Sequence, residues 1–235
     1  VGQTVEGTID WERRFDLMQQ HSGEHIVSGL VHSLFGYHNV GFHMGAEVVT
    51  FDFDCIIPAA DLPEIERLAN EAVYQNIPLS CYIPDEQTLK TIPYRTKREL
   101  PYPVRLVEIP GYDTCACCGI HVKQTGEIGM IKLLSVVKFH QGVRMEMVCG
   151  ERARQLLGEI FHQNKLVSQT FSAKLLETGA VAMQKNEALS AEKSRAGMLE
   201  KQLCDAIAKA YAGQDTDTVA LAFAGYESPT YAQVQ

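Results

Sequence analysis

The chain has 235 residues, of which 46% are hydrophobic, and this is enough to bury one sizeable core. Its net charge of −8 at pH 7 argues, taken alone, against a nucleic-acid-binding protein, since contacts to phosphate need lysine and arginine. No apolar run approaches the roughly 20 residues that span a bilayer, and residues 1–10 lack the features of a signal peptide, so we expect no membrane association and a cytoplasmic location.

The first predicted elements are a strand and a long helix. Residues 1–9 have the composition of a strand, and Asp10 is placed to cap a helix from Trp11 to Phe35, which Gly36 would stop. Since the chain has no initiator Met and opens within a strand, we expect that an amino-terminal part of the protein precedes it.

A second strand and an amphipathic helix are predicted next. Residues 47–54 alternate apolar and polar side chains, which is the period of a half-buried strand. Asp61, with Glu64 three residues later, resembles a capping box at the start of a helix that ends before Pro78.

Short strands follow in the middle of the chain. They are predicted at residues 79–83, 104–109, 128–139 and 143–148, with Gln141-Gly142 as a hairpin turn. Because helices and strands mix without regular alternation, we predict an α+β fold in which helices pack on one face of a largely antiparallel sheet.

A helical extension is predicted after the sheet. From Glu151 to about Ala212 the composition favours helix, with interruptions expected near Asn164 and Gly179. Residues 189–207 are polar on most sides, which is typical of an antiparallel hairpin or a coiled coil and would allow a homodimer through this extension. A further strand is expected at residues 218–223.

Two histidines four residues apart lie in the first predicted helix. His21 and His25 would project from one face of that helix, where two imidazoles can bind one metal ion. Gly23 between them has poor helix propensity, which indicates close approach by another part of the protein. Histidines at this spacing are more often surface or core residues, so the motif alone leaves both interpretations open.

A second pair has the same spacing. Cys117 and His121 lie in a Gly-containing turn, and seven cysteines, three of them between residues 115 and 118, suit metal binding better than a disulfide framework. Sulfur and nitrogen donors together favour zinc. A buried free cysteine beside an unrelated histidine would explain this motif alone, but the two pairs supply the four ligands of a tetrahedral site.

Three blocks of sequence follow one another in a specific order. They are His21-Ser22-Gly23-Glu24-His25, the run Val40 to Gly45 with the strand Phe51 to Phe53 after it, and Cys117 to His121 leading into Val122 to Gly129. From about Gly7 to Arg154, their order and spacing resemble the alanyl-tRNA editing family, which comprises free-standing editing proteins and the editing domain of alanyl-tRNA synthetase.

The resemblance implies one zinc ion per chain, bound by His21, His25, Cys117 and His121. It implies hydrolytic editing, in which serine or glycine wrongly joined to tRNA(Ala) is released at the acceptor end. A synthetase pocket for alanine cannot strongly reject glycine or serine, so a second, hydrolytic site is needed. Since four protein ligands leave no open position, we expect that the metal either orders the site or changes its ligand shell to engage the aminoacyl group.

The resemblance also predicts how the chain is divided. Residues 1–10 would end an amino-terminal barrel module, and residues 11–154 would form the zinc-containing editing domain. Residues 155–212 would be the helical extension, and residues 213–235 would begin a carboxy-terminal domain.

Three residues are candidates for catalytic contacts with substrate or water. His43 follows the first helix where related domains tend to carry a polar residue, although a structural histidine fits equally well. Ser22 keeps a hydroxyl where many relatives have Thr, and Glu24 offers a carboxylate that would point away from His25. Ile120 stands where many relatives have Thr, which leaves the choice between serine and glycine open. Cys115 and Cys118 are interpreted as structural neighbours of the site.

Positive charge is concentrated in the middle of the chain. Residues 1–90 hold 4 Lys and Arg against 14 Asp and Glu, whereas residues 91–154 hold 10 against 6. We predict that tRNA approaches the side built by this basic segment. The candidates for contacting it are Arg95, Lys97, Arg98, Lys123 and Arg144; for any one of them, a solvated surface role is equally plausible.

Two other functions are compatible with parts of the sequence. The spacing of His21, Glu24 and His25 fits an inverted zinc-peptidase motif, but this leaves Cys117 and His121 unexplained. A non-catalytic tRNA-binding or assembly fragment of a synthetase-like protein, with structural zinc, would fit a chain that is part of a longer protein.

Overall fold

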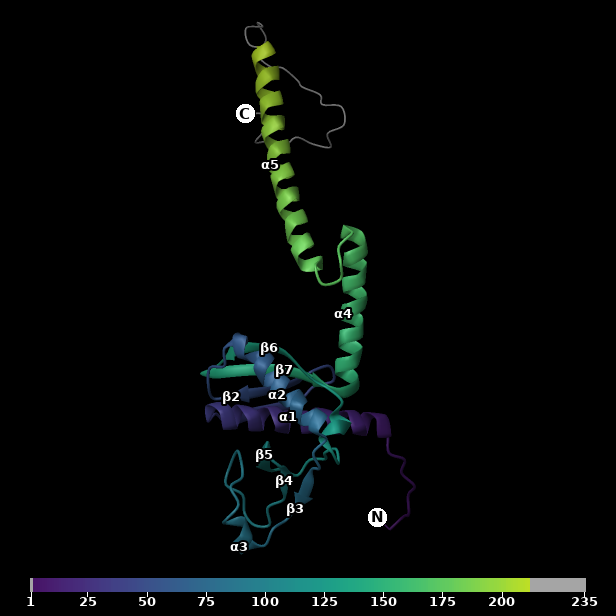
Figure 1. Cartoon of the computed structure of the whole chain (residues 1–235), viewed down its shortest axis with the longest axis vertical. Coiled ribbons are helices and arrows are strands. Elements are labelled where there is room, and N and C mark those ends of the chain that lie inside the picture. The colour runs from purple at the N-terminus through teal and green to yellow at the C-terminus, as the bar shows by residue number, and fades with distance from the viewer. Residues whose placement is uncertain (1, 212–235) are drawn as a thin grey trace. The chain divides into compact units, whose positions relative to one another are not determined.

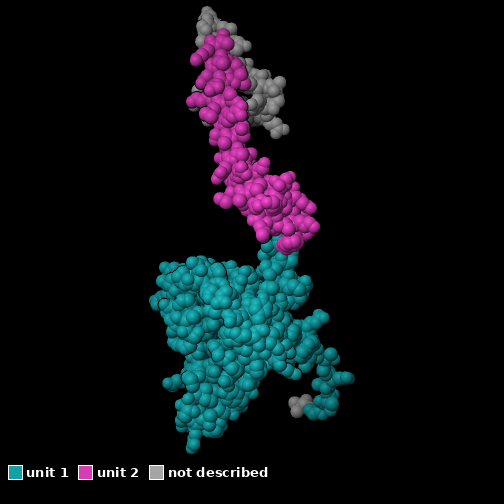
Figure 2. Space-filling model, viewed as in Figure 1, with its two compact units in different colours: residues 1–160 teal, residues 161–235 magenta. Residues whose placement is uncertain are grey.

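The structure, a computed structural model, describes residues 2–211 of the chain. It divides into two compact units, residues 1–160 and residues 161–235, which Figure 2 distinguishes by colour. The predicted strand at residues 218–223 and the predicted domain at residues 213–235 lie outside the described residues.

The first unit combines helices with two antiparallel sheets (Figure 1). Its helices are α1 (Trp11–Phe35), α2 (Leu62–Gln75), α3 (Glu86–Leu89) and the 3-10 turns η1 (Ala59–Asp61) and η2 (Thr125–Ile128). Its strands are β1 (Asn39–Met44), β2 (Val49–Phe53), β3 (Ser80–Tyr82), β4 (Leu106–Ile109), β5 (Asp113–Ala116), β6 (Ile131–Phe139) and β7 (Gly142–Cys149). The sheet orders are β1-β2-β7-β6 and β3-β4-β5.

Helix α1 begins and ends where the sequence predicts. The side chain of Asp10 accepts a hydrogen bond from the backbone N–H of Arg13, and Gly36 ends the helix with φ of 72°, a left-handed conformation that glycine adopts without strain. Every residue from Gln19 to Val31 is buried, because α1 lies between the two sheets. The polar side chains in this stretch therefore need partners inside the protein.

The core lies between α1, α2 and one face of the four-stranded sheet. Helix α2 contributes its buried face of Ile65, Ala69, Ala72 and Val73, as its periodicity predicts. The sheet contributes alternate residues such as Phe51 and Phe53. This confirms the predicted α+β fold with helices on one face of an antiparallel sheet. The three-stranded sheet on the other side of α1 is an addition to that prediction.

Several local predictions were wrong. Residues 2–10 form no strand, and β1 and β5 were not predicted. Asp61 makes no capping hydrogen bond, because it ends η1 with helical backbone angles, whereas a capping residue needs an extended backbone. The predicted hairpin forms and joins β6 to β7, but its turn is His140-Gln141, one residue earlier than predicted, because Gly142 is the first residue of β7 and pairs with Phe139.

The helical extension is formed by α4 (Gly150–Phe171) and α5 (Thr178–Tyr211). The chain stays helical through Asn164, so the predicted interruption there was wrong; the break lies at residues 172–177. Asn164 instead fixes this connection, since its Nδ2 donates to the carbonyl oxygen of Leu175 and its Oδ1 accepts from Thr178. Within residues 2–211, no helix is long and apolar enough to cross a membrane.

Candidate metal centre

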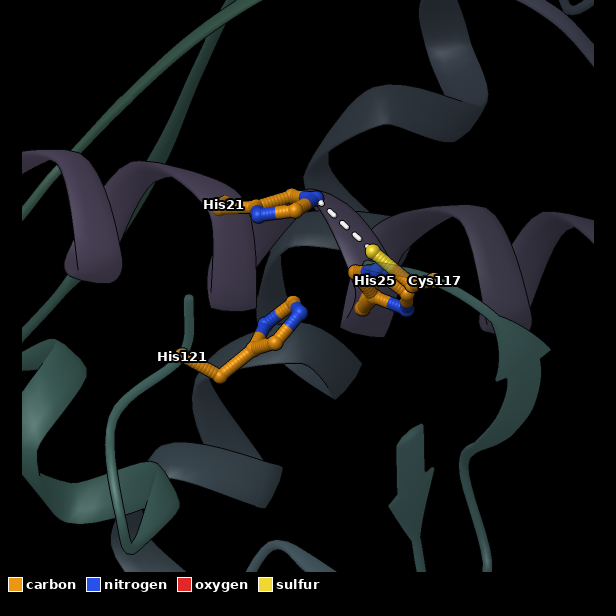
Figure 3. Close-up of side chains that lie close together, drawn as sticks. All are labelled: His21, His25, Cys117 and His121. Carbon is orange, nitrogen blue, oxygen red and sulfur yellow. Dashed lines mark hydrogen bonds between the residues drawn. The ribbon is translucent and has the colours of Figure 1, made fainter. Parts of the chain in front are cut away.

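Two segments far apart in the sequence bring four metal-binding side chains together. His21 and His25 come from one face of α1, and Cys117 and His121 come from the loop that follows β5 (Figure 3). One donor atom from each residue lies within 4.8 Å of all the others. Cys117 Sγ is 3.5 Å from His21 Nε2, which is close to the separation of about 3.6 Å that Zn–N bonds of ~2.1 Å and Zn–S bonds of ~2.3 Å impose in a tetrahedron.

The histidine rings are held so that Nε2 faces the cluster. His25 Nδ1 is 2.8 Å from Asp113 Oδ2, and His121 Nδ1 is 3.4 Å from Ser22 Oγ. His121 Nε2 is buried and has no hydrogen-bond partner in residues 2–211. Burying a nitrogen without a hydrogen-bond partner is costly. The unpaired Nε2 of His121 therefore indicates that this atom binds a ligand, such as a metal ion, within the cluster.

The protonation of the cluster also fits a cation. Burial raises the pKa of the Cys117 thiol, but the neighbouring imidazoles of His121, His21 and His25 outweigh it and lower that pKa to about 3. Burial lowers the pKa of His121 to about 4, so this ring is neutral at pH 7. Burial also disfavours the charged form of His25, but the hydrogen bond to Asp113 raises its pKa to about 10. A thiolate and neutral imidazoles are the forms that bind metals, and the proton of His25 would have to leave.

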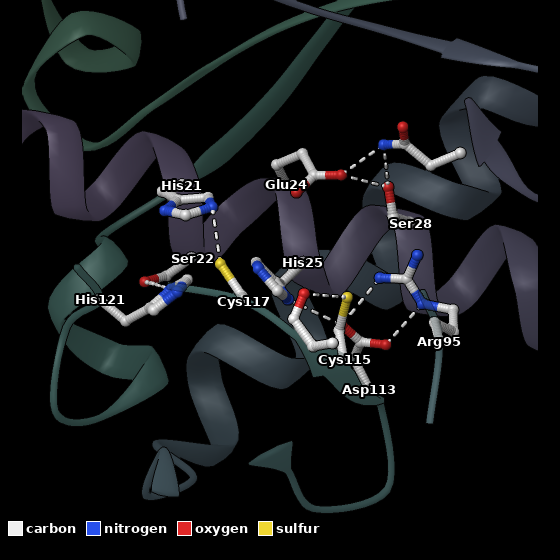
Figure 4. Close-up of polar contacts among 12 residues, drawn as sticks. His21, Ser22, Glu24, His25, Ser28, Arg95, Asp113, Cys115, Cys117 and His121 are labelled. Carbon is white, nitrogen blue, oxygen red and sulfur yellow. Dashed lines mark hydrogen bonds and ion pairs between the residues drawn. The ribbon is translucent and has the colours of Figure 1, made fainter. Parts of the chain in front are cut away.

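A second layer of residues holds His25 in place. Asp113 accepts two hydrogen bonds from Arg95, at 2.6 and 2.8 Å (Figure 4). Burial disfavours the charged guanidinium of Arg95, but Asp113 outweighs it and raises the pKa of that group above its ordinary value. Arg95, predicted to contact tRNA, is thus engaged with a buried carboxylate. Cys115 lies with His25 and Asp113, and its burial raises the pKa of the thiol to about 12, so it stays protonated.

Two glycines permit the close packing around the cluster. A Cβ atom at Gly23 would lie 2.3 Å from Cys149 Sγ, which confirms the close approach that this mid-helix glycine predicts. A Cβ atom at Gly119 would lie 2.2 Å from His21 Cε1. Both positions exclude any larger residue unless the neighbours move.

A cavity of about 480 Å³ opens beside the cluster and is lined in part by His21, His25 and Cys117. Its remaining wall is strongly basic and includes Arg95, Lys97, Arg98 and Arg105. The Lys97 ammonium lies 5.8 Å from the ring centre of Phe42, which itself stacks on His21.

Arg105 is a residue of this wall that the sequence did not single out. Its guanidinium donates to the carbonyl oxygens of Cys117 and Gly119, at 2.6 and 3.1 Å, and so holds the loop that carries two of the four cluster residues. No spacing in the sequence distinguishes it from the other basic residues of this segment.

The three catalytic candidates lie in different places. Glu24 lines the cavity, although the sequence suggested that it points elsewhere. Ser22 is fully buried, and its Oγ accepts the backbone N–H of Val122 next to His121. His43 is exposed and does not line the cavity, because it follows Phe42 in β1 and successive side chains of a strand point to opposite faces.

Two of the tRNA-binding candidates also lie outside the cavity wall. Lys123 is exposed. Arg144 pairs with Asp52 across β2 and β7, at 2.7 Å, and its guanidinium carbon lies 3.7 Å from the ring centre of Phe139. Ile120 is 38% exposed and is not part of the wall either.

The fold and the cluster together define an α+β domain with three histidines and one cysteine beside a basic cavity. Residues 104–145, which include Cys117 and His121, match the family described as the threonyl and alanyl tRNA synthetase second additional domain. The chain is 28% identical over 195 residues to the alanyl-tRNA editing protein Aarsd1-A of Xenopus laevis, a match that covers 76% of this chain and 47% of that protein.

Alanine–tRNA ligases are similar as well. The ligase of Methanothermobacter thermautotrophicus is 32% identical over 206 residues, covering 83% of this chain and 23% of the ligase. The ligase of Thermofilum pendens is 37% identical over 151 residues, covering 61% of this chain and 17% of the ligase. The chain therefore belongs to the family of alanyl-tRNA editing proteins and related ligase domains, as its sequence blocks predict. It spans less than half the length of each of these relatives.

Proposed function

We propose that this chain hydrolyses the ester bond of wrongly charged tRNA(Ala) and releases serine, glycine or both. The observation that carries the proposal is the cluster of His21, His25, Cys117 and His121 on the wall of a basic cavity. The names of the relatives support the same substrate class, since they include alanyl-tRNA editing proteins and alanine–tRNA ligases. A protein that edits tRNA would work in the cytoplasm.

We propose zinc as the metal, one ion per chain, because three imidazoles and one thiolate are a donor set that zinc prefers. When bound, zinc would supply a positive charge that fixes the site and can polarise a nearby carbonyl group or water molecule. Asp113 and Ser22 would keep the rings of His25 and His121 oriented through their Nδ1 atoms.

The basic wall would hold the acceptor end of the tRNA. Lys97 and Arg98 are exposed at the cavity and can contact phosphate groups of a single-stranded end. The aminoacyl bond is an activated ester, so holding its carbonyl carbon and a water molecule in place provides much of the catalysis. Residues 11–154 would form the editing domain, with residues 155–212 as its extension.

The proposal is tested by serine release from Ser-tRNA(Ala), with Gly-tRNA(Ala) and Ala-tRNA(Ala) alongside. The wild type should release serine or glycine faster than alanine, and Cys117→Ala should lose this activity together with its zinc, assayed in the same samples. Cys81→Ala is the matched control, because Cys81 is an exposed thiol in β3. No release from any substrate by zinc-loaded wild type would overturn the proposal.

A closed set of four ligands favours one alternative, a tRNA-binding fragment with structural zinc, since structural zinc sites have four protein ligands. In that case the zinc-loaded protein would bind tRNA and hydrolyse none of the three esters. A zinc peptidase is disfavoured, because the residues that join His21 and His25 are Cys117 and His121, and no glutamate in residues 2–211 completes this cluster.

A further inference from the structure

A buried carboxylate that forms no ion pair lies on the cavity wall next to the His/Cys cluster. Glu24 is 6% exposed, and its Oε1 accepts hydrogen bonds from Ser28 Oγ and Asn39 Nδ2, both at 2.5 Å (Figure 4). Its Oε2 accepts no hydrogen bond from the described residues, and no lysine or arginine among them pairs with it.

Other shielded carboxylates of this unit are paired differently. Three of them form an ion pair with an arginine at 2.6 to 2.7 Å, namely Asp16 with Arg152, Asp52 with Arg144, and Asp113 with Arg95, and Glu66 pairs with Lys132 at 2.9 Å. A carboxylate removed from water is costly unless a cation compensates it. Glu24 has no such ion pair, so its carboxylate is free to pair with a cation that enters the cavity.

The basic residues of the cavity wall are occupied elsewhere or exposed. Arg95 is bound to Asp113, and Arg105 is bound to two backbone carbonyl oxygens of the cluster loop. The Lys97 ammonium lies over Phe42, and Arg98 is exposed. The charges of Arg95 and His25 act on Glu24 through space, but no basic residue of the wall forms an ion pair with it.

Asn39 adds a second acceptor at the same place. It lines the cavity with Glu24, and its carbonyl oxygen Oδ1 is buried without a hydrogen-bond partner in the described residues. A register shift in β1 between Asn39 and Gly41 allows Asn39 and Phe42, three residues apart, both to contact α1. Two acceptors that lack donors suit a group with several N–H donors and a positive charge.

We propose that Glu24, supported by Asn39, binds the α-ammonium group of the aminoacyl ester. This inference rests on the proposed function and specifies which feature of the substrate the site recognises. An α-amino group titrates near neutral pH, so its protonated form, which carries three N–H donors, is available at pH 7. It is attached one carbon from the ester carbonyl, so holding it at Glu24 keeps that carbonyl beside His21 and His25. Glycyl, seryl and alanyl esters all carry this group, so it would anchor the aminoacyl end without discriminating among the three.

The test compares Ser-tRNA(Ala) with the matching glyceroyl ester, in which a hydroxyl replaces the amino group of serine. The wild type should favour the seryl ester by more than about tenfold in kcat/KM. Glu24→Gln should lower kcat/KM for the seryl ester by about 10- to 100-fold, the effect of one charge-assisted hydrogen bond, and leave the glyceroyl ester within about threefold. Glu24→Asp keeps the charge and should keep the preference. Glu187→Gln, an exposed carboxylate in α5, is the matched control.

The Glu24→Gln variant is expected to fold, because its amide oxygen can still accept hydrogen bonds from Ser28 and Asn39. Zinc content and circular dichroism are measured in every sample to check this. Equal losses on the two esters would overturn the inference and assign Glu24 to the fold or to the reaction itself. A wild type that hydrolyses both esters equally fast would overturn it without any variant. A wild type that hydrolyses neither ester overturns the proposed function, which distinguishes that failure from a failure of the ammonium site.

Discussion

Cys117 is the residue whose chemistry depends most on its neighbours. A thiol in an ordinary setting has a pKa near ~8.5, and burial would raise it further. Here the three histidines of the cluster lower the pKa of Cys117 to about 3, although burial acts in the opposite direction. In the metal-free protein at neutral pH, Cys117 is therefore a thiolate next to the protonated His25, whose pKa lies at about 10.

This predicts how Cys117 reacts with an alkylating agent once the metal is removed. Because the folded-state pKa is lowered, the thiolate is present above about pH 3, and the alkylation rate should be nearly constant between pH 5 and pH 8. A small free thiol in the same solution should instead react about ten times faster per pH unit over that range. Mass spectrometry of the Cys117 peptide measures the rate, and added zinc should protect it. A rate at Cys117 that climbs with pH as the free thiol does would contradict the prediction.

Helix α1 carries two residues of the cluster, His21 and His25, and also passes through the centre of the unit, and this sets limits on its sequence. Its buried polar residues are satisfied by specific partners, as in Gln20, which donates to the carbonyl oxygen of Cys149 and accepts the N–H of the same residue. Such paired contacts fix the position of the helix along the sheet, and with it the position of His21 and His25.

Gly23 is predicted to be essential to this packing. Alanine is the better helix former, but a Cβ at Gly23 would meet Cys149 Sγ at 2.3 Å, so Gly23→Ala should lower the free energy of unfolding by about 1–3 kcal/mol. Gly158→Ala is the control in α4, where no atom lies within 4 Å of the added Cβ, and it should raise that free energy by up to about 1 kcal/mol. Urea unfolding measures both. Equal stabilisation by the two substitutions would show that the contact with Cys149 relaxes freely.

The segment between α3 and β4 is predicted to provide the phosphate contacts. The double substitution of Lys97 and Arg98 by Ala should reduce the salt dependence of tRNA binding by about 1 to 2 units in the slope of log K against log salt. Arg144→Ala should leave the slope nearly unchanged, because Arg144 is paired with Asp52 and lies outside the cavity wall. Titrations at several salt concentrations measure the slopes. A larger change for Arg144 than for the double variant would place the tRNA on the face of the four-stranded sheet.

At the scale of the whole molecule, we expect the two units to have separable roles, with the candidate site in the first and the helical extension in the second. Residues 1–160 contain the hydrophobic core of the described residues, the cluster and the cavity, so a chain that ends at Ile160 should fold and keep the proposed zinc binding and deacylase activity. If the helical extension mediates a homodimer, sedimentation analysis should find a dimer for the full chain and a monomer for the shortened one. A shortened chain that loses zinc and circular dichroism together would show that residues 161–235 are needed for the fold.

The sequence by itself determined the features that depend on near neighbours. Capping by Asp10, termination at Gly36 and the buried face of α2 follow from local spacing, because helix periodicity and end signals act within a few residues. The pairs His21/His25 and Cys117/His121 are likewise visible in the sequence, because the residues of each pair are four apart. The order of the sequence blocks identified the family.

Tertiary structure alone decided which residues from different segments meet. The strand order β1-β2-β7-β6 and the separate β3-β4-β5 sheet involve pairing between distant segments, which no local period encodes. The same long-range pairing brings Asp113 and Arg95 to His25, places Glu24 and Asn39 on one cavity wall, and leaves His43 on the opposite face of its strand. Side-chain direction in a strand and burial in a helix depend on what packs above them, and only the folded chain provides that information.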